Sequence, residues 1–206
     1  MGSAFCSGGD LSWLASEPDA GVDALRTRMM AFYRSWLSVP GLEVPTIAAI
    51  NGPAIGAGFA VALACDLRFI ATTARVGVPF TALGLHPGMA TTWSLPRVAG
   101  QAVARDLLLT GRLVDGEEAV RLGLASRAVP APDVLAEALG AAERMAAAAP
   151  IATALTLQAL RGGGHASFEA ALQWEGLAQP VTMATADLIE GLAAAGERRT
   201  PHFRGR

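Results

Sequence analysis

Stretches of apolar and polar residues alternate along the chain and divide it into short strands and helices. The β-branched run "VPTIAAI" at 44–50 predicts a buried strand, and the Asn51-Gly52-Pro53 turn ends it. The small, apolar residues 56–64 predict a short helix, and "DLRFIA" at 66–71 predicts the next strand. Strand, helix and strand at this spacing predict a βαβ unit whose parallel strands are buried on both faces.

Weaker patterns surround this unit. Residues 1–11 predict a short strand that opens into the Gly-rich turn "SGGDL", and a helix is expected over 22–38. A loop rich in Gly and Pro follows at Gly77–Gly88, and a helix over Val98–Thr110 is closed by Gly111. Asp115 and Glu118 form a capping box that begins a further helix.

From Asp133 onward, Ala-rich helical stretches alternate with breaks at Pro150, at Gly162–Gly164 and at Pro180. The chain shows no internal repeat and no linker long enough to separate two independent domains. We therefore predict an α/β core over residues 1–130 and a helical region over residues 131–206.

Composition narrows the classes of partner. The 206 residues are 52% hydrophobic and 17% charged, with a net charge of -2, which argues against a disordered chain and against a nucleic-acid surface. All sixteen basic residues are arginine, so mechanisms that need a Schiff-base lysine or a phosphate-loop lysine are excluded. Small molecules and further copies of the chain are the expected partners.

The uncharged run 44–65 approaches the length of about 20 residues that spans a bilayer. Pro45 and the Asn51-Gly52-Pro53 turn interrupt it, so no membrane span is expected. The chain shows no secretory leader, and Cys6 and Cys65 lie among small or apolar residues. Reduced thiols and a cytoplasmic location are the prediction.

The spacing Gly52-x-x-x-Gly56-x-Gly58 between a strand and a helix is one that short-chain dehydrogenases use to bind a dinucleotide pyrophosphate. Such enzymes resemble one another in also carrying a Tyr-x-x-x-Lys pair. Here Tyr33 is the single tyrosine and lysine is absent, and the preceding strand does not begin the domain. These features disfavour a dehydrogenase.

Two distant segments carry a stronger resemblance, "SAFCSGGDL" at 3–11 and "TIAAINGPAIGAGFAVALACDLR" at 46–68. Together with "GVPFTALGLHPGMATTWSLPRVAG" at 77–100, "LLLTGRLVDGEEAVRLGLASRAVP" at 107–130 and the final "DLIEGLAAAGERRTPHFRGR", they resemble the crotonase superfamily of enoyl-CoA hydratases and isomerases. The resemblance covers essentially the whole chain. It implies a crotonase-like (ClpP/crotonase) α/β core of repeated β-β-α units with a C-terminal helical region.

The resemblance also implies chemistry on an acyl-coenzyme A thioester whose enolate-like oxyanion is held by two backbone N–H groups. By motif these belong to Gly9 and Ala57. The N–H groups that open a helix have no partner within it and lie at the positive end of its dipole, which suits developing negative charge. Either glycine-rich segment alone is explained by tight turns and close packing, but both in family order favour an oxyanion hole.

The resemblance assigns substrate contacts to the residues around these two groups and implies no metal and no cofactor beyond the coenzyme A of the substrate. The expected contacts are Cys6, Ser7, Asp10, Leu11, Gly56, Leu83 and Pro87.

By the same resemblance, the helical region 131–206 is expected to assemble the chain into a homotrimer or a homohexamer, and its Ala- and Leu-rich faces suit an interface.

The sequence departs from the family where protons are moved. Two glutamates activate water in the hydratases, and their positions match Ala60 and Phe80. Some isomerases place an aspartate in the loop that matches "HPGMA", where this chain has Gly88. His86 is the nearest titratable candidate, since nothing beside Cys6 would activate its thiol. Enolate chemistry and non-catalytic acyl-CoA binding both remain open, whereas ordinary hydration by two glutamates is not expected.

A second departure lies at the front of the sequence. The family carries a βαβ segment before its Gly-x-Gly-x-Ala-Phe motif, and Met1 occupies the x position of that Gly-x-Gly. The expectation from the resemblance is that Met1 is an internal methionine of a longer reading frame and that two strands of the sheet precede it.

Overall fold

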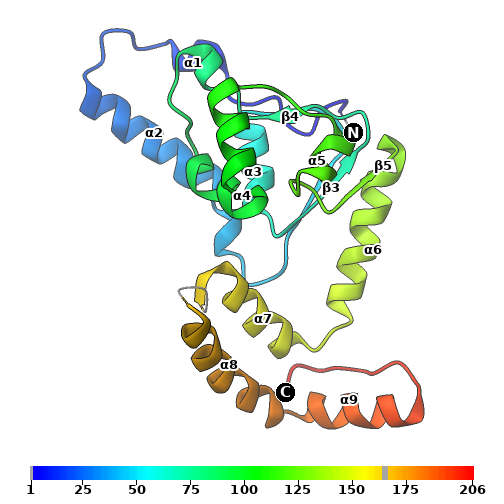
Figure 1. The fold of residues 1–206 in the computed structure, drawn as a ribbon. Helices are drawn as coiled ribbons and strands as arrows, with labels where there is room; N and C mark the ends of the chain where they lie inside the picture. Colours follow the sequence, from blue (N-terminus) through cyan, green and yellow to red (C-terminus); the bar gives the residue numbers. More distant parts are fainter. Residues whose placement is uncertain (1, 164–166) are drawn as a thin grey trace. The chain divides into compact units, whose positions relative to one another are not determined.

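A computed structural model describes residues 2–163 and 167–206 of the chain (Figure 1). The chain forms two compact units, of which the first comprises the residues up to Leu42 together with Thr46–Ala138. The second comprises Glu43–Pro45 together with Leu139–Arg206. Met1 and Gly164, on which two of the predictions above depend, lie outside the described residues.

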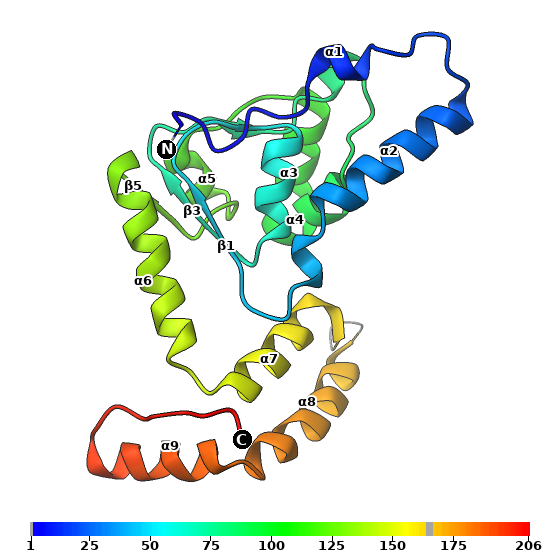
Figure 2. The same ribbon diagram turned by 180° about the vertical axis from the view of Figure 1, so that it is seen from behind.

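The sheets of the first unit are small and parallel. β1 (Ile47–Ile50), β3 (Leu67–Ala71) and β5 (Arg127–Val129) form one sheet in the order β1-β3-β5, and Figure 2 shows β1 and β3 side by side. A second sheet pairs β2 (Ala54–Ile55) with β4 (Val76–Gly77). Because α3 (Ala57–Ala64) lies between β1 and β3 in the chain, the predicted βαβ unit is confirmed.

The core of this unit is buried between the strands and their covering helices. Ile50 and Ile70 of the larger sheet are fully buried, as are Leu95 and Leu107 of α4 (Thr91–Thr110), while Phe59 of α3 is 1% exposed. Figure 1 shows α3 and α4 beside each other. The predicted burial on both faces is confirmed for β3, whose last four residues are all buried, whereas β1 alternates between half-buried and buried residues.

The helix α4 begins earlier than the sequence predicted. Gly100 adopts φ 79° and ψ 165° inside it and divides it into two arms, of which the second corresponds to the predicted helix over Val98–Thr110. The predicted end of the helix at Gly111 is confirmed, because Gly111 has φ 67° and donates its N–H to the Leu107 carbonyl at 3.0 Å.

The capping box before α5 (Gly116–Arg121) is half formed. The Asp115 carboxylate accepts the N–H of Glu118 at 2.8 Å, as expected for an N-cap. The Glu118 carboxylate accepts instead from Arg112 Nη1, at 2.7 Å. An ion pair has thus replaced the reciprocal bond of the capping box.

The predicted strand over residues 1–11 does not form among residues 2–10. Cys6 makes one isolated parallel bridge to Ala54, and the chain then enters α1 (Leu11–Leu14). The short run of small residues around the glycines cannot supply a longer pairing segment. The next helix, α2 (Val22–Trp36), lies within the predicted range 22–38.

Arg68 is a buried cation that joins β3 to the chain before β5. It is 8% exposed, its Nε donates to the Leu124 carbonyl and its Nη1 donates to the Cys65 carbonyl, both at 2.7 Å. Burial lowers the pKa of its guanidinium from the ordinary value.

Replacing Arg68 by methionine is expected to lower the free energy of unfolding by about 2 kcal/mol, because two carbonyls lose charged donors. Urea denaturation measures the change. The matched variant Arg105→Met, at an exposed position of α4, should stay within about 0.5 kcal/mol of the parent protein. Equal losses in the two variants would contradict this role for Arg68.

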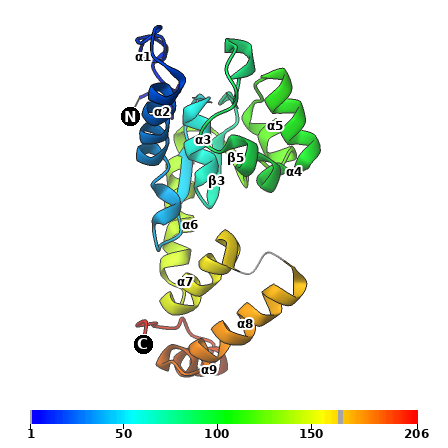
Figure 3. The ribbon, with the colours of Figure 1, turned by 90° about the vertical axis from the view of Figure 1, so that its left-hand side faces the viewer.

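The second unit is built from helices. The last part of α6 (Val134–Ala146) is followed by α7 (Pro150–Gln158), a five-residue π-helical turn (Ala159–Gly163), α8 (Phe168–Met183) and α9 (Ala186–Glu197), and Figure 3 shows α7, α8 and α9 in succession. Pro150 is the first residue of α7, and Gly162 breaks the chain with φ 143°.

The predicted break at Pro180 is wrong, because this proline lies inside α8. It is in the last turn of the helix, so the missing N–H removes a single intrahelical bond and α8 continues to Met183.

The final residues of the chain fold back onto the first turn of α9. Asp187 is 4% exposed and accepts the N–H groups of Arg204 and Gly205 at 2.7 and 2.8 Å. The N–H of Ala186 donates to the Arg206 carbonyl at 2.8 Å. A buried carboxylate is thereby hydrogen-bonded within the unit.

Glu190 of α9 binds Arg199 in a bidentate pair at 2.6 and 2.9 Å and accepts the His202 N–H at 2.8 Å. The Arg199 hydrogen bonds, followed by that from His202, lower the pKa of Glu190 from 4.5 to about 2. The contribution of this carboxylate to stability is therefore present above pH 4.5 and is lost as the pH falls through about 2.

NMR titration of the Glu190 side chain should show this depressed midpoint. The effect on overall stability is expected to be small because Arg199 is exposed to solvent and Glu190 is only partly buried. In Arg199→Gln, the Glu190 midpoint should return toward the ordinary value, and an unchanged midpoint would contradict the assignment.

Candidate functional site

A cavity of about 320 Å³ lies in the first unit. Four parts of the chain form its wall: the turn and helix around Gly9, the inner side of α2, the opening of α3, and the loop from Pro79 to Met89. The two segments "SAFCSGGDL" and "INGPAIGAGFA" thus contribute to one hollow, although about forty residues separate them in the sequence.

Backbone contacts hold the N-terminal turn against the opening of α3. The N–H of Ile55 donates to the Cys6 carbonyl at 3.0 Å. A Cβ on Gly58 would lie 2.1 Å from that same oxygen, so only glycine permits this approach. Gly8 has φ 107°, and a Cβ there would lie 2.8 Å from the Ile55 carbonyl oxygen. Glycine is therefore required on both sides of the contact.

The expected oxyanion donors meet at this junction. Ala57 is the first residue of α3, after Gly56 with φ 57° and ψ -117°, and both Ala57 and Gly9 line the cavity. The Gly56 N–H is used, because it donates to the Gly77 carbonyl at 2.9 Å. Within residues 2–163 and 167–206, neither the Ala57 nor the Gly9 N–H makes a hydrogen bond. Both donors are available to a bound molecule.

Aromatic rings form much of the wall. The rings of Trp13 and Phe32 lie 5.2 Å apart between centroids, and Phe32 meets Tyr33 edge to face at 6.2 Å. The Arg28 guanidinium lies over the Trp13 ring, 3.9 Å from its centroid. Such a wall favours an apolar group inside the cavity.

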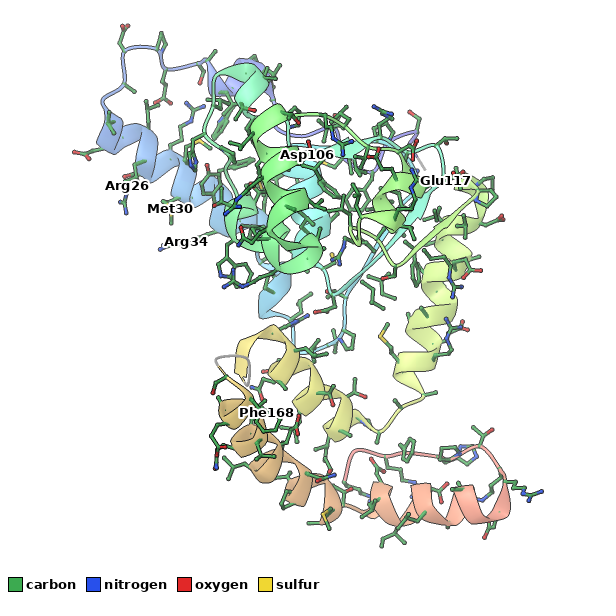
Figure 4. All side chains as sticks on the ribbon, viewed as in Figure 1. Arg26, Met30, Arg34, Asp106, Glu117 and Phe168 are labelled. Atoms are coloured by element: carbon green, nitrogen blue, oxygen red, sulfur yellow. The ribbon has the colours of Figure 1, made fainter. Side chains whose placement is uncertain are left out.

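The helix α2 has two different faces. Figure 4 shows Arg26, Met30 and Arg34 on the face that points away from α3 and α4, and all three are exposed. Met29, Phe32 and Tyr33 line the cavity from the other face. The helix therefore presents two arginines and Met30 outward and a set of large, mostly apolar side chains to the cavity.

Comparison with known proteins identifies the family. The family described as enoyl-CoA hydratase/isomerase matches residues 1–206. The chain belongs to the enoyl-CoA hydratase/isomerase family. A probable enoyl-CoA hydratase of Mycobacterium tuberculosis is 38% identical over 200 residues, which cover 97% of this chain and 76% of that protein. An (E)-benzylidenesuccinyl-CoA hydratase of Thauera aromatica is 44% identical over 162 residues, covering 78% of this chain and 63% of that protein.

Solved structures of enoyl-CoA hydratases have the same fold as this chain. An enoyl-CoA hydratase from Bacillus anthracis has a TM-score of 0.91 at 35% identity, with 100% of this chain and 79% of that chain covered. A putative enoyl-CoA hydratase from Streptomyces coelicolor has a TM-score of 0.92 at 32% identity, with 100% and 76% covered. The predicted crotonase-like α/β fold is confirmed, and the dehydrogenase alternative is excluded by the family.

The two positions at which hydratases of the family are expected to carry glutamate differ in their surroundings. Phe80 lines the cavity, and its ring would lie 3.9 Å from a Cβ on Gly56. Ala60 is 2% exposed and lies one helical turn after Ala57, outside the cavity wall. No Asp or Glu of the described chain lines this cavity. Its wall therefore offers no carboxylate to move a proton.

The remaining predicted contacts divide into two groups. Ser7, Leu11, Gly56, Leu83 and His86 line the cavity, and His86 and Leu83 are exposed to solvent. Cys6, Asp10 and Pro87 do not line it.

Two of these outer residues have structural partners in the fold. The Cys6 carbonyl joins the N-terminal turn to β2. The Asp10 carboxylate accepts the Ser12 hydroxyl at 2.6 Å and the Ser12 N–H at 2.8 Å, and these bonds lower its pKa.

The contribution of α2 to the cavity is not among the sequence predictions. The sequence does carry a sign of a buried helix face, because the spacing of Leu25, Met29, Phe32 and Trp36 places four large apolar side chains along one side of a helix. Such a stripe predicts burial without specifying whether a core or a cavity lies beneath it.

A second hollow, of about 390 Å³, lies in the second unit between α7 and α8. Its wall includes Leu155, Trp174 and Glu175 and none of the predicted site residues.

Over residues 2–163 and 167–206, no cluster of three or more His, Cys, Asp and Glu could hold a metal ion. In that same part of the chain, every helix is too short or too polar to cross a membrane. The first cavity is the one that combines unpaired backbone donors with the family motifs among the residues that the structure describes.

Proposed function

We propose that the chain binds an acyl-CoA thioester in the 320 Å³ cavity and stabilises its enolate through the N–H groups of Gly9 and Ala57. The observation that carries the proposal is the Ala57 N–H, which opens α3 in the cavity wall and has no partner within the described residues. A thioester oxygen there gains two fixed donors and the positive end of a helix dipole.

The proposed chemistry is enolate formation in acyl-CoA metabolism without the usual pair of glutamates. Phe80 makes the cavity drier where a water would otherwise be activated. His86 lies exposed at the edge of the wall and is the one imidazole that lines this cavity in the described chain. We assign it a role in proton exchange with solvent, since an imidazole ring can both accept and donate a proton.

Non-catalytic acyl-CoA binding is the second candidate, and the absence of carboxylates from the described cavity wall favours it. A protein of this kind would hold a thioester for transport or sensing. It needs the same apolar cavity, but it has no need of a proton acceptor.

Deuterium exchange separates the two candidates. The protein is incubated with butanoyl-CoA in D₂O, and replacement of the α-protons is followed by NMR, while crotonyl-CoA is followed by loss of its conjugated thioester absorbance. Exchange above the rate in buffer supports enolate formation. Binding of butanoyl-CoA by calorimetry without exchange supports the carrier, and absence of binding overturns both candidates.

Assembly and location complete the proposal. Large apolar side chains of α8 and α9 are exposed in the second unit, including Leu177 at 73%, Ile189 at 67% and Leu192 at 64%. The exposure of these side chains supports the proposed homotrimer or homohexamer, in which they would be buried between copies of the chain. A cytoplasmic location remains part of the proposal because acyl-CoA metabolism supplies the ligand there.

A further inference from the structure

Tyr33 is a polar group within an otherwise apolar part of the cavity wall. It comes from the inner face of α2, beside Met29 and Phe32. Its hydroxyl reaches the opposite loop so closely that a Cβ on Gly88 would lie 2.5 Å from the oxygen. Gly88 is buried, so the phenol occupies the space that any side chain at position 88 would need.

The Tyr33 hydroxyl has no hydrogen-bond partner within the described residues. The oxygen is partly open to solvent, so the hydroxyl is free to donate to an acceptor that a bound ligand brings into the cavity. Burial alone raises the pKa of Tyr33 above its ordinary value of 10.0. At neutral pH the group is therefore a neutral O–H donor.

The charge of the surroundings limits what can accept this hydrogen bond. The chain has no lysine, and no arginine of the described chain lines the cavity. The nearby Arg28 is not among the lining residues, and its guanidinium lies over the Trp13 ring, donates to the Ser16 hydroxyl at 2.9 Å and pairs with Glu17 at 3.4 Å. The exposed His86 is the one basic side chain of the described cavity wall, so a carboxylate beside the phenol would have no arginine or lysine as a countercharge, whereas a ketone or hydroxyl oxygen needs only the phenol.

We propose that Tyr33 is a specificity-determining residue whose hydroxyl donates to a neutral oxygen carried by the acyl group beyond its thioester. The inference rests on the proposed binding of an acyl-CoA in this cavity. It assigns the site to acyl thioesters that combine an apolar body, packed against Trp13 and Phe32, with one ketone or hydroxyl group.

Calorimetry with three kinds of probe tests this assignment. These are hexanoyl-CoA, the oxohexanoyl-CoA isomers with the ketone beyond the β-carbon, and adipoyl-CoA, which ends in a carboxylate. At least one oxo isomer should bind about 5- to 10-fold more tightly than hexanoyl-CoA, the range that one net hydrogen bond gives. Adipoyl-CoA should bind more weakly than hexanoyl-CoA.

The variant Tyr33→Phe keeps the ring and removes the hydroxyl, so the ratio of the two affinities should fall to about one. Ser35→Ala removes an exposed hydroxyl from the same helix and should preserve the preference. Because Tyr33 is the only tyrosine, a ¹³C label at Cζ gives one NMR signal. Its chemical shift should respond to the preferred oxo isomer more than to hexanoyl-CoA.

The outcomes separate this inference from the proposed function. Binding of hexanoyl-CoA without preference for any oxo isomer, or a preference that persists in Tyr33→Phe, overturns the role of Tyr33 alone. Tighter binding of adipoyl-CoA than of every oxo isomer overturns the choice of a neutral oxygen. Absence of binding by every probe overturns the proposed function itself.

Discussion

Replacement of Ala57 by proline is expected to slow α-proton exchange in butanoyl-CoA by about 100- to 1000-fold, the loss typical when one oxyanion donor is removed. Proline is well tolerated at the first position of a helix, where its fixed φ fits and its missing N–H costs no intrahelical bond. The change therefore removes the proposed donor while retaining α3 (Ala57–Ala64).

The matched variant Ala57→Ser adds one hydroxyl and retains the N–H, so its exchange rate should stay within about tenfold of the parent protein. Circular dichroism and thermal unfolding of both variants establish that the fold is intact. If Ala57→Pro folds and exchanges as fast as Ala57→Ser, the N–H of Ala57 has no part in stabilising the enolate.

Replacement of Gly58 by alanine is expected to reduce the free energy of unfolding by about 3 kcal/mol, because an added methyl group overpacks a rigid contact. Its Cβ would lie 2.1 Å from the Cys6 carbonyl oxygen and 2.7 Å from the Cys6 Cβ. That same carbonyl accepts the Ile55 N–H at 3.0 Å, so a shift of the carbonyl away from the added methyl group strains this hydrogen bond. Urea denaturation measures the loss.

Gly41→Ala is the control for Gly58→Ala, since a Cβ on Gly41 has no atom within 4 Å and the residue has no positive φ. It should change stability by less than about 0.5 kcal/mol. Similar stability in the two variants would show that the close approach at Gly58 is not required.

The sequence predicted the elements whose signals are local. The apolar run before Asn51 and the run after Asp66 gave β1 and β3, since buried parallel strands need apolar side chains on both faces. β2 and β4 have two residues each and form by pairing with each other. Two residues are too few to show the alternation of apolar and polar positions by which a strand is predicted from sequence. Likewise, the residues around Gly100 do not predict the non-helical backbone conformation by which this glycine divides α4.

For the candidate site, the motifs predicted that the turn at Gly9 and the helix opening at Ala57 lie together, and both line one cavity. They could not predict Tyr33, because its role depends on the distance between α2 and the loop at Gly88. A helical stripe of large side chains is the same for a filled core and for a cavity wall. The distinction comes only from the packing of the whole unit.

The return of the last residues onto α9 has a practical consequence for protein engineering. The backbone of Arg204 and Gly205 satisfies the buried Asp187 carboxylate, and Arg206 accepts from Ala186, so these residues serve the helix as a cap. A fusion partner or affinity tag joined directly after Arg206 would weaken the hydrogen bonds that these three residues make with the first turn of α9. Deletion of the last three residues would leave a buried negative charge without its donors, and a flexible spacer after Arg206 is the safer design.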